Sequence, residues 1–274
     1  MDTNFLCLLQ RLTFRIKAAT CTANQMKNTD TKAVILVGGL GTRLRAIIPS
    51  TPKPLAPVGD RPFLELLIRQ LQGQGIRHLV MCSGYLADQI EGEFGDGRGL
   101  GVAIEYSKES QPLGTAGAIK FAETHLQSVP EFLVMNGDSY LEIDLGQLLR
   151  FHCLHGGLAT VAVVAVENAG RYGTVVADSG HRVTAFSEKT GNDSPGLINA
   201  GIYVFRRALL DQIPAGPSSL EKDVFPKILD QGVYAAERRG MFIDIGTPGD
   251  YARAQVLLDR LYRATSHDAQ GTQA

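Results

Sequence analysis

Hydrophobic residues recur along the chain with two spacings, and each spacing predicts a type of element. Five consecutive apolar residues at 33–37 end in glycines, which fits a buried parallel strand better than a helix. Apolar residues then recur at helical spacing over 63–71, and Gly73 and Gly75 end that helix. Further strands are predicted at 78–82, 102–106 and 131–135, and helices at 86–94 and 116–126. This alternation is typical of a doubly wound parallel sheet flanked by helices.

The pattern changes after Gly157. Strands are predicted at 160–166, 174–177, 183–186 and 198–205, and helices at 221–229 and 249–262. Because no Pro-rich or Ser-rich linker separates the halves, we expect one α/β domain over residues 32–264. Residues 1–31 are expected to be a weakly ordered extension, and residues 265–274 a flexible tail.

Composition excludes several classes of protein. The 274 residues carry 27 basic and 28 acidic side chains, so no overall field attracts nucleic acid or an anionic membrane. No stretch approaches the roughly 18 apolar residues of a membrane span. The apolar run at 5–9 precedes its basic residues, the reverse of a secretory signal. Four scattered cysteines suggest reduced thiols, and we expect a cytoplasmic protein.

A glycine-rich turn directly follows the first strand. The sequence GGLGTRL at 38–44 allows backbone N–H groups to surround phosphate oxygens, and its arginine can grip phosphate through two hydrogen bonds. Leu44 stands where a dinucleotide-binding fingerprint requires a third glycine, and no P-loop lysine follows. A purely structural turn is the alternative. The candidate phosphate contacts are Gly38, Gly39, Gly41, Thr42 and Arg43.

One lysine and two aspartates are further candidates for polyphosphate chemistry. Lys53 lies between two prolines that restrict its position, so it is either a second phosphate cation or an ordinary surface lysine. Asp138 follows Asn-Gly at a strand end, where it could equally serve a turn. Asp244 lies in an apolar strand, and neither aspartate has a basic neighbour in sequence. Two separated carboxylates plus substrate phosphates commonly hold Mg²⁺, so we predict Asp138 and Asp244 as its ligands.

Segments at other strand ends are candidates for binding the rest of a nucleotide and a second substrate. A base is expected near the ends of neighbouring strands, at Leu36, Ser83, Gln111, Gly114 and Thr115. Thr115 is also a candidate N-cap of the following helix. In the second half, amide, carboxylate and cationic groups that could bind hydroxyls and phosphate stand at strand ends, where turns are the alternative: Gly173, Glu188, Lys189 and Asn199.

Taken in order, these motifs resemble the sugar-1-phosphate nucleotidyltransferases. The resemblance runs from Ala33 to Tyr262 through GGLGTRL, PKPL, QPLGTAGA, NGD, RYGTV, INAGIY, SLEKDVFP and DIGTP. It implies a Rossmann-like mixed, mainly parallel sheet, an NTP and a sugar 1-phosphate as substrates, and pyrophosphate as leaving group. It further implies that Arg43 and Lys53 bind phosphates, that Asp138 and Asp244 bind Mg²⁺, and that Glu188 and Lys189 bind the sugar and its phosphate.

Within this family the motifs look most like the D-glycero-D-manno-heptose 1-phosphate guanylyltransferases, which implies GTP and a heptose 1-phosphate as substrates. Ala46, where many relatives carry proline, fits that branch. Mannose or glucose 1-phosphate with GTP, UTP or dTTP is the alternative, as is a non-catalytic regulatory relative. A homo-oligomer is left open.

Overall fold

The structure is a computed structural model, and it describes residues 28–268 except 40, 42, 45–46 and 188–193. Four parallel strands form the first half of one sheet, in the order β5-β4-β1-β6. β1 pairs with β4 through Val34↔Val80 and with β6 through Val34↔Val134, so all three strands end at the same edge. Their bounds are Lys32–Leu36 for β1, His78–Ser83 for β4, Ala103–Lys108 for β5 and Glu131–Asn136 for β6.

The second half extends this sheet with a mixture of strand directions. β11 runs antiparallel to β6 and also pairs with β8, and β12 runs parallel to β8. β9 pairs with β11, and β10 pairs with β9. The bounds are Ala159–Val166 for β8, Thr174–Ala177 for β9, Val183–Ser187 for β10, Gly196–Arg206 for β11 and Val233–Glu237 for β12. The predicted α/β fold with a mixed, Rossmann-like sheet is confirmed.

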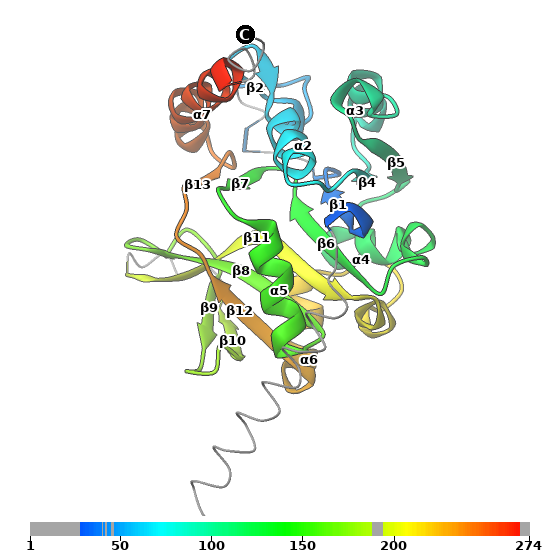
Figure 1. The fold of residues 1–274 in the computed structure, drawn as a ribbon, viewed down its shortest axis with the longest axis vertical. Coiled ribbons are helices and arrows are strands. Elements are labelled where there is room, and N and C mark those ends of the chain that lie inside the picture. The colour runs from blue at the N-terminus through cyan, green and yellow to red at the C-terminus, as the bar shows by residue number, and fades with distance from the viewer. Residues whose placement is uncertain (1–27, 40, 42, 45–46, 188–193, 269–274) are drawn as a thin grey trace, which may run out of the picture.

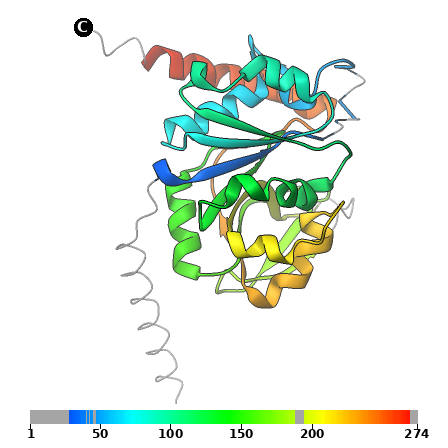
Figure 2. The same cartoon turned by 90° about the vertical axis from the view of Figure 1, so that its right-hand side faces the viewer.

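Helices cover both faces of the sheet, which Figure 2 shows as a layer between them. One apolar core joins the sheet to α2 (Phe63–Gly73), α3 (Ala87–Phe94), α5 (Leu145–His155) and α7 (Pro248–Asp268). The other joins it to α4 (Gly114–Phe121), the π-helical turn η6 (Leu220–Val224) and α6 (Phe225–Ile228). Burying apolar side chains on both faces explains why the central strands are almost uninterrupted apolar runs.

Two small ladders lie outside the main sheet (Figure 1). β2 (Pro57–Val58) and β3 (Arg61–Pro62) form a hairpin that α7 contacts through the Tyr251 hydroxyl, which donates to the Pro57 carbonyl oxygen at 2.5 Å. β7 (Ser139–Leu141) pairs with β13 (Phe242–Asp244), with Asp244 opposite Ser139. This second ladder brings two segments about 100 residues apart in sequence beside the end of β6.

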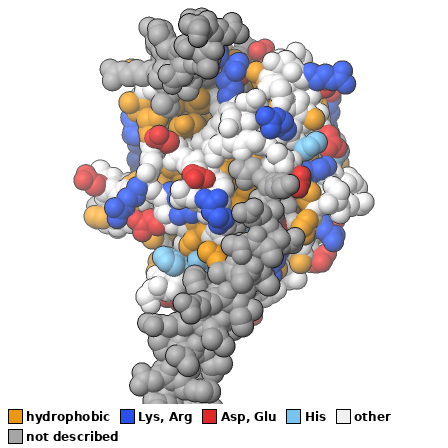
Figure 3. Space-filling model, in the orientation of Figure 1, with side chains coloured by type: hydrophobic (Ala, Val, Ile, Leu, Met, Phe, Trp, Pro, Cys, Tyr) orange, Lys and Arg blue, Asp and Glu red, His pale blue; other side chains and the backbone are white. Residues whose placement is uncertain are grey.

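The surface agrees with the balanced charge of the sequence. On the described part of the face in Figure 3, basic and acidic side chains are interspersed and do not gather into a patch of one sign. Within the described residues, every helix is too short or too polar to cross a membrane.

Candidate active site

The carboxyl ends of β1 and β6 open into a cavity of about 260 Å³. The loops that follow these parallel strands necessarily meet at this edge, as expected for ligand sites of open α/β sheets. β11 is antiparallel to β6, so its first residues reach the same edge. The lining residues are Leu36, Gly38, Gly39, Cys82, Glu109, Pro112, Gly114, Thr115, Ala118, Asn136 and Asp138.

Two glycines leave room for the Glu109 carboxylate. A Cβ at Gly38 would lie 2.8 Å from Glu109 Oε1, and a Cβ at Gly84, after β4, would lie equally close to it, so a side chain at either position would displace the carboxylate. Gly41 has φ +58°, and a Cβ there would lie 3.0 Å from Lys53 Cβ, so the glycine loop passes close to the lysine.

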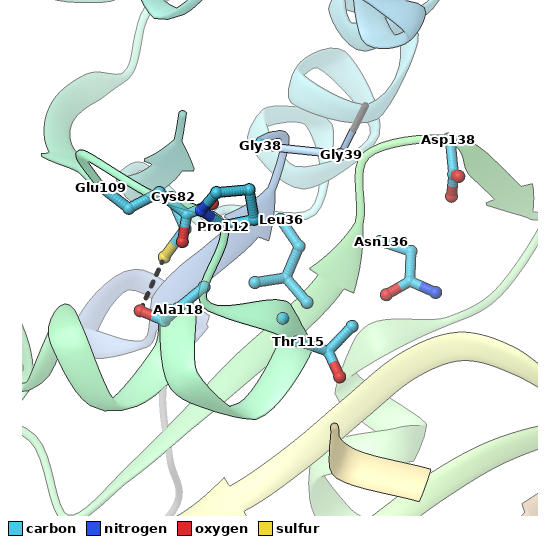
Figure 4. Close-up of a pocket in the computed structure, with 11 residues that line it drawn as sticks. Leu36, Gly38, Gly39, Cys82, Glu109, Pro112, Thr115, Ala118, Asn136 and Asp138 are labelled. Atoms are coloured by element: carbon cyan, nitrogen blue, oxygen red, sulfur yellow. Dashed lines mark hydrogen bonds between the residues drawn. The ribbon is translucent and has the colours of Figure 1, made fainter. Parts of the chain in front are cut away.

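The two ends of the cavity differ in chemistry, as Figure 4 shows. Glu109, Cys82 and Pro112 lie at one end, and Asp138 lies at the other. Burial raises the pKa of the Glu109 carboxyl, while a hydrogen bond at 3.3 Å from the Leu113 N–H partly opposes this. Burial also raises the pKa of Cys82 to about 12, so this thiol is not a nucleophile at neutral pH.

Lys53 and two carboxylates meet at the Asp138 end. Lys53 Nζ lies 2.6 Å from Asp138 Oδ2; the Lys53 side chain is largely shielded from solvent, whereas the Asp138 side chain is 36% exposed. Asp244 reaches the same place because the Ile245 N–H donates to the Asp138 carbonyl oxygen at 3.0 Å. Burial raises the pKa of Asp244, and the Asp138 charge raises it further, while Lys53 and a hydrogen bond from the Gly246 N–H lower it. Asp138 does have a cation beside it, supplied from a distant part of the chain.

A second cavity of about 790 Å³ adjoins the first, and Asn136 lines both. Its walls come from the start of β9, the end of β10, the start of β11 and η6. They combine polar side chains with apolar surface that includes the Phe186 ring, which stacks on Phe225. The lining residues are Asn136, Tyr172, Gly173, Thr174, Phe186, Ser187, Asn199, Ser219, Glu221, Lys222 and Pro226.

The structure brings together most of the predicted residues that it describes. Leu36, Gly38, Gly39, Gly114, Thr115 and Asp138 line the first cavity, and Gly173 and Asn199 line the second. Six predicted residues that the structure describes lie outside both linings. Lys53 and Asp244 lie beside Asp138, and Gly41 lies against the Lys53 side chain. Ser83 is fully buried, Gln111 is exposed, and Arg43 is exposed in a turn. Thr42, Glu188 and Lys189 fall outside the described residues.

The predicted capping role of Thr115 is wrong. Helix α4 begins at Gly114, with Leu113 at the N-cap and no side-chain cap. Thr115 Oγ1 instead accepts a hydrogen bond from the Leu220 N–H at 2.9 Å. The hydroxyl therefore ties η6, which borders the second cavity, to the wall of the first.

Glu109, Asn136 and Glu221 are among the lining residues to which the sequence analysis gave no role. Asn136 and Glu221 stand inside the NGD and SLEKDVFP motifs, so the motifs were visible although these side chains received no role. Glu109 follows β5 directly, and its place at a strand end was the available signal.

Comparisons with known proteins agree with this geometry. Residues 32–260 match the nucleotidyl transferase family model. The chain is 39% identical to the mannose-1-phosphate guanylyltransferase catalytic subunit beta of Drosophila melanogaster over 85% of its length, and 40% identical to the mannose-1-phosphate guanylyltransferase of Mycobacterium tuberculosis over 86%. These matches span 64% and 66% of the relatives, so the chain covers just under two thirds of their length.

Solved structures give the same result. HddC from Yersinia pseudotuberculosis, complexed with GMP-PN, superposes with a TM-score of 0.75 at 32% identity, covering 82% of this chain and 98% of that one. A putative glucose-1-phosphate thymidylyltransferase from Bacillus anthracis shares the fold, with a TM-score of 0.74 at 23% identity, covering 83% and 94% of the two chains. The motifs, the sheet and the family match lead to one conclusion: the chain belongs to the nucleotidyl transferase family.

Proposed function

We propose that the protein transfers the guanylyl group of GTP to a sugar 1-phosphate and releases pyrophosphate. The observation that carries this proposal is the pair of cavities joined at Asn136, with Lys53, Asp138 and Asp244 at one end of the first. In this arrangement the base lies toward Glu109, and the triphosphate runs past the glycine loop toward Asp138. The sugar enters from the second cavity, so its phosphate meets the α-phosphorus where the cavities join.

Glu109 supports guanine as the base. A carboxylate only accepts hydrogen bonds, and guanine presents two neighbouring donors, its N1–H and its 2-amino group. Adenine lacks both of these donors, and uracil and thymine present one N–H flanked by two carbonyl oxygens that a carboxylate repels. The half-buried position of Glu109 makes this discrimination stronger, because an unpaired buried acceptor is costly.

The residues at the join of the cavities suit a nucleotidyl transfer. A phosphomonoester has a second pKa near 6, so the sugar phosphate is already largely dianionic at pH 7 and needs no general base. Its oxygen attacks the α-phosphorus in line with the departing pyrophosphate. Lys53 is placed to neutralise charge that develops on the transferring phosphoryl group, and the amides of the glycine loop hold the remaining phosphates.

The carboxylates at this end fit a divalent cation. Asp138 and Asp244 converge, and burial together with the Asp138 charge raises the pKa of Asp244. A cation between them would relieve that repulsion, and substrate phosphates would complete its ligands. Mg²⁺ held there would neutralise phosphate charge and orient the triphosphate. Among the described residues, groups of three or more metal-ligating side chains are absent, which agrees with a metal site that substrate helps to build.

The acceptor is a sugar 1-phosphate, and two candidates are supported by different observations. The curated relatives at 39–40% identity are named for mannose 1-phosphate. The motifs of the sequence resemble the heptose branch, so heptose 1-phosphate stays a prediction. We take mannose 1-phosphate as the first acceptor to test, because its support extends over 85% of the chain.

A two-way substrate panel tests the proposal. GTP, ATP, UTP and dTTP are each combined with mannose, glucose and heptose 1-phosphates, and both pyrophosphate and the nucleotide sugar are measured. We expect GTP with mannose or heptose 1-phosphate to give both products. A clear preference for UTP or dTTP would contradict the assignment of the base. Absence of pyrophosphate in every combination, with GTP still binding, would favour the non-catalytic alternative.

A further inference from the structure

Asp244 is carried by a short segment that a small ladder holds in place. β13 is three residues long and pairs with β7, where Asp244 lies opposite Ser139. The Ile245 N–H donates to the Asp138 carbonyl oxygen at 3.0 Å, and α7 begins at Pro248. A two-stranded ladder is only marginally stable by itself. The place of the Asp244 carboxylate therefore depends on what holds the chain on either side of it.

On the side that leads into α7, a buried aspartate closes the first turn. The Thr247 hydroxyl donates to Asp250 Oδ2 at 2.6 Å, and the Asp250 N–H donates to Thr247 Oγ1 at 3.3 Å. Asp250 is 9% exposed, and its carboxylate also accepts a hydrogen bond from the Arg171 guanidinium. A buried carboxylate needs such partners, because an unpaired buried charge is costly. Asp250 therefore ties the start of α7 to the loop between β8 and β9.

The same loop contacts the other side of the segment. The Tyr172 ring packs edge-on against Phe242 of β13, with the ring centroids 5.9 Å apart. The Arg171 guanidinium lies 5.7 Å from the centroid of the Tyr172 ring. Phe242 comes two residues before Asp244, and Asp250 comes six residues after it. One loop thus holds the segment that carries Asp244 from both sides.

The Asp244 carboxylate has little room to move. The Gly246 N–H donates to Asp244 Oδ1. A Cβ at Gly246 would collide with that oxygen and would lie 3.4 Å from Lys53 Nζ. The carboxylate therefore lies between the turn into α7 and the lysine that pairs with Asp138. A shift of this turn would move Asp244 relative to both Lys53 and Asp138.

We propose that Arg171 and Asp250 are positioning residues that hold Asp244 where it binds the divalent cation together with Asp138. This inference rests on the proposed function. The pair acts through the backbone of β13 and the first turn of α7. Groups that orient metal ligands typically contribute roughly 10- to 100-fold to metal affinity, and we expect the lower end because this pair does not touch the Asp244 carboxylate itself.

The test measures metal binding directly. Mn²⁺ replaces Mg²⁺, and water-proton relaxation is followed with GTP present and sugar phosphate absent. This signal distinguishes Mn²⁺ in the slowly tumbling protein complex from Mn²⁺ bound to free GTP. We expect Arg171→Gln and Asp250→Asn to weaken Mn²⁺ binding by about tenfold. Arg171→Lys keeps a cation beside Asp250 and should restore part of the affinity.

Arg206→Gln is the matched control. Arg206 pairs with Glu131 at 3.4 Å, and their side chains are 41% and 16% exposed, against 54% and 11% for Arg171 and Asp250. Glu131 begins β6, at the opposite end of that strand from Asn136. Breaking either ion pair should lower the melting temperature to a similar extent. Arg171→Gln should also lower the affinity for Mn²⁺, whereas Arg206→Gln should not.

A double substitution shows whether the pair acts through Asp244. In an Asp244→Asn background, Asp250→Asn should cause no further loss of Mn²⁺ affinity, because the ligand that it positions is already gone. A loss that adds to that of Asp244→Asn would place the effect of the pair elsewhere in the site and overturn the inference. If Asp250→Asn does not fold, Arg171→Gln decides in the same background, since its side chain is more exposed.

The outcomes distinguish this inference from the proposed function. If the wild-type protein forms nucleotide sugar while folded Arg171→Gln and Asp250→Asn bind Mn²⁺ as tightly as it does, the inference is overturned and the activity stands. If the wild-type protein binds Mn²⁺ with GTP without turnover, and the variants bind it more weakly through Asp244, the inference holds and the catalytic proposal fails. If Asp244→Asn itself leaves Mn²⁺ binding unchanged, Asp244 is not a ligand and the inference is overturned whatever the activity.

Discussion

Replacing Glu109 by glutamine tests how the base is read. The substitution keeps the shape that fits between Gly38 and Gly84, where a Cβ on either glycine would lie 2.8 Å from the carboxylate oxygen. It also keeps an oxygen that can accept from the Leu113 N–H. What changes is the edge offered to the base, because the amide replaces one acceptor by a donor that faces a donor of guanine.

The magnitude follows from the hydrogen bonds that are lost. A hydrogen bond to a charged group contributes about 1.5–3 kcal/mol net, and a facing pair of donors leaves a buried group unsatisfied. The value of kcat/KM for GTP should therefore fall by roughly 10- to 150-fold. Glu93→Gln, on the exposed side of α3, is the matched control and should leave it unchanged.

The assay compares GTP with ITP, which lacks the 2-amino group. The wild-type protein should prefer GTP by about tenfold, and Glu109→Gln should lose this preference. Removing the 2-amino group from the nucleotide and replacing Glu109 in the protein should therefore have strongly non-additive effects on kcat/KM. Since burial raises the pKa of the Glu109 carboxyl, protonation at falling pH should weaken GTP use earlier than for an ordinary glutamate. The variant, which has no proton to gain there, should lack that limb of the profile.

An equal loss of GTP and ITP activity in Glu109→Gln would refute this reasoning, because it would place the carboxylate away from the 2-amino group. Unchanged GTP kinetics would place the base elsewhere in the cavity. Thermal denaturation shows whether Glu109→Gln stays folded at the assay temperature. If it does not, GTP and ITP kinetics measured below its melting temperature decide whether the carboxylate reads the 2-amino group.

Three further predictions concern the phosphate end and the core. Asp138→Asn should lower turnover in saturating Mg²⁺ on the order of 100-fold with little change in melting temperature. Excess chelator should abolish wild-type activity, and full turnover in chelator would contradict the metal site. Lys53→Ala should lower kcat by about ten- to a thousandfold, whereas Lys227→Ala on the exposed surface of α6 should leave kcat unchanged. A change confined to the KM for the sugar phosphate would show that Lys53 contacts that substrate and not the triphosphate. Burial lowers the pKa of His152 to about 3, so unfolding takes up a proton below pH 6.5, and the free energy of unfolding should fall by about 1.4 kcal/mol per pH unit from there. Chemical denaturation at pH 7.5 and 5.5 should show this fall in the wild-type protein and not in His152→Gln.

The elements of the first half of the fold could be predicted because each has its own hydrophobic pattern within a short stretch of sequence. Each parallel strand is buried on both faces, so it reads as an apolar run, and the predicted strand at 78–82 and helix at 63–71 match β4 and α2 closely.

β12 and α5 were not predicted. β12 is short, and its apolar residues Val233 and Ala235 flank a tyrosine, so neither spacing stands out. The helix predicted at 221–229 is a π turn, a short α-helix and a 3₁₀ turn, because Pro226 interrupts the regular ladder. α7 extends to Asp268, beyond the predicted end at Tyr262.

Much of the lining of the first cavity could be predicted for the same reason. Its residues follow consecutive strands, and parallel strands place their loops at one edge. Proximity between separate loops was harder to predict. The sequence analysis found no basic neighbour of Asp138 along the chain, and in the structure Lys53 Nζ lies 2.6 Å from its carboxylate. The two residues are 85 apart in sequence, so the spacing of residues does not reveal this pair.

The second cavity depends on a departure from regular structure in β11, and this explains why the prediction there named Asn199 and passed over Glu221. In a regular strand Asn199 and Tyr203 would share a face without touching, and Glu221 would have no reason to approach either. From Asn199 to Tyr203, β11 advances four residues while β8 advances two, which forms a bulge in β11. Asn199 Nδ2 therefore donates to the Tyr203 hydroxyl at 2.8 Å, and Gly201, with φ +73°, makes the bulge sterically feasible beside Asn136. Gly201→Ala should therefore perturb the second cavity. Its Cβ would collide with Asn136 and Ser139, and the shift of β11 would move the Asn199 amide and the Tyr203 hydroxyl, which both donate to Glu221 Oε1 at 3.2 Å. Its effect should appear in the KM for the sugar phosphate before it appears in the KM for GTP, and the reverse order would show that the bulge serves the nucleotide cavity instead.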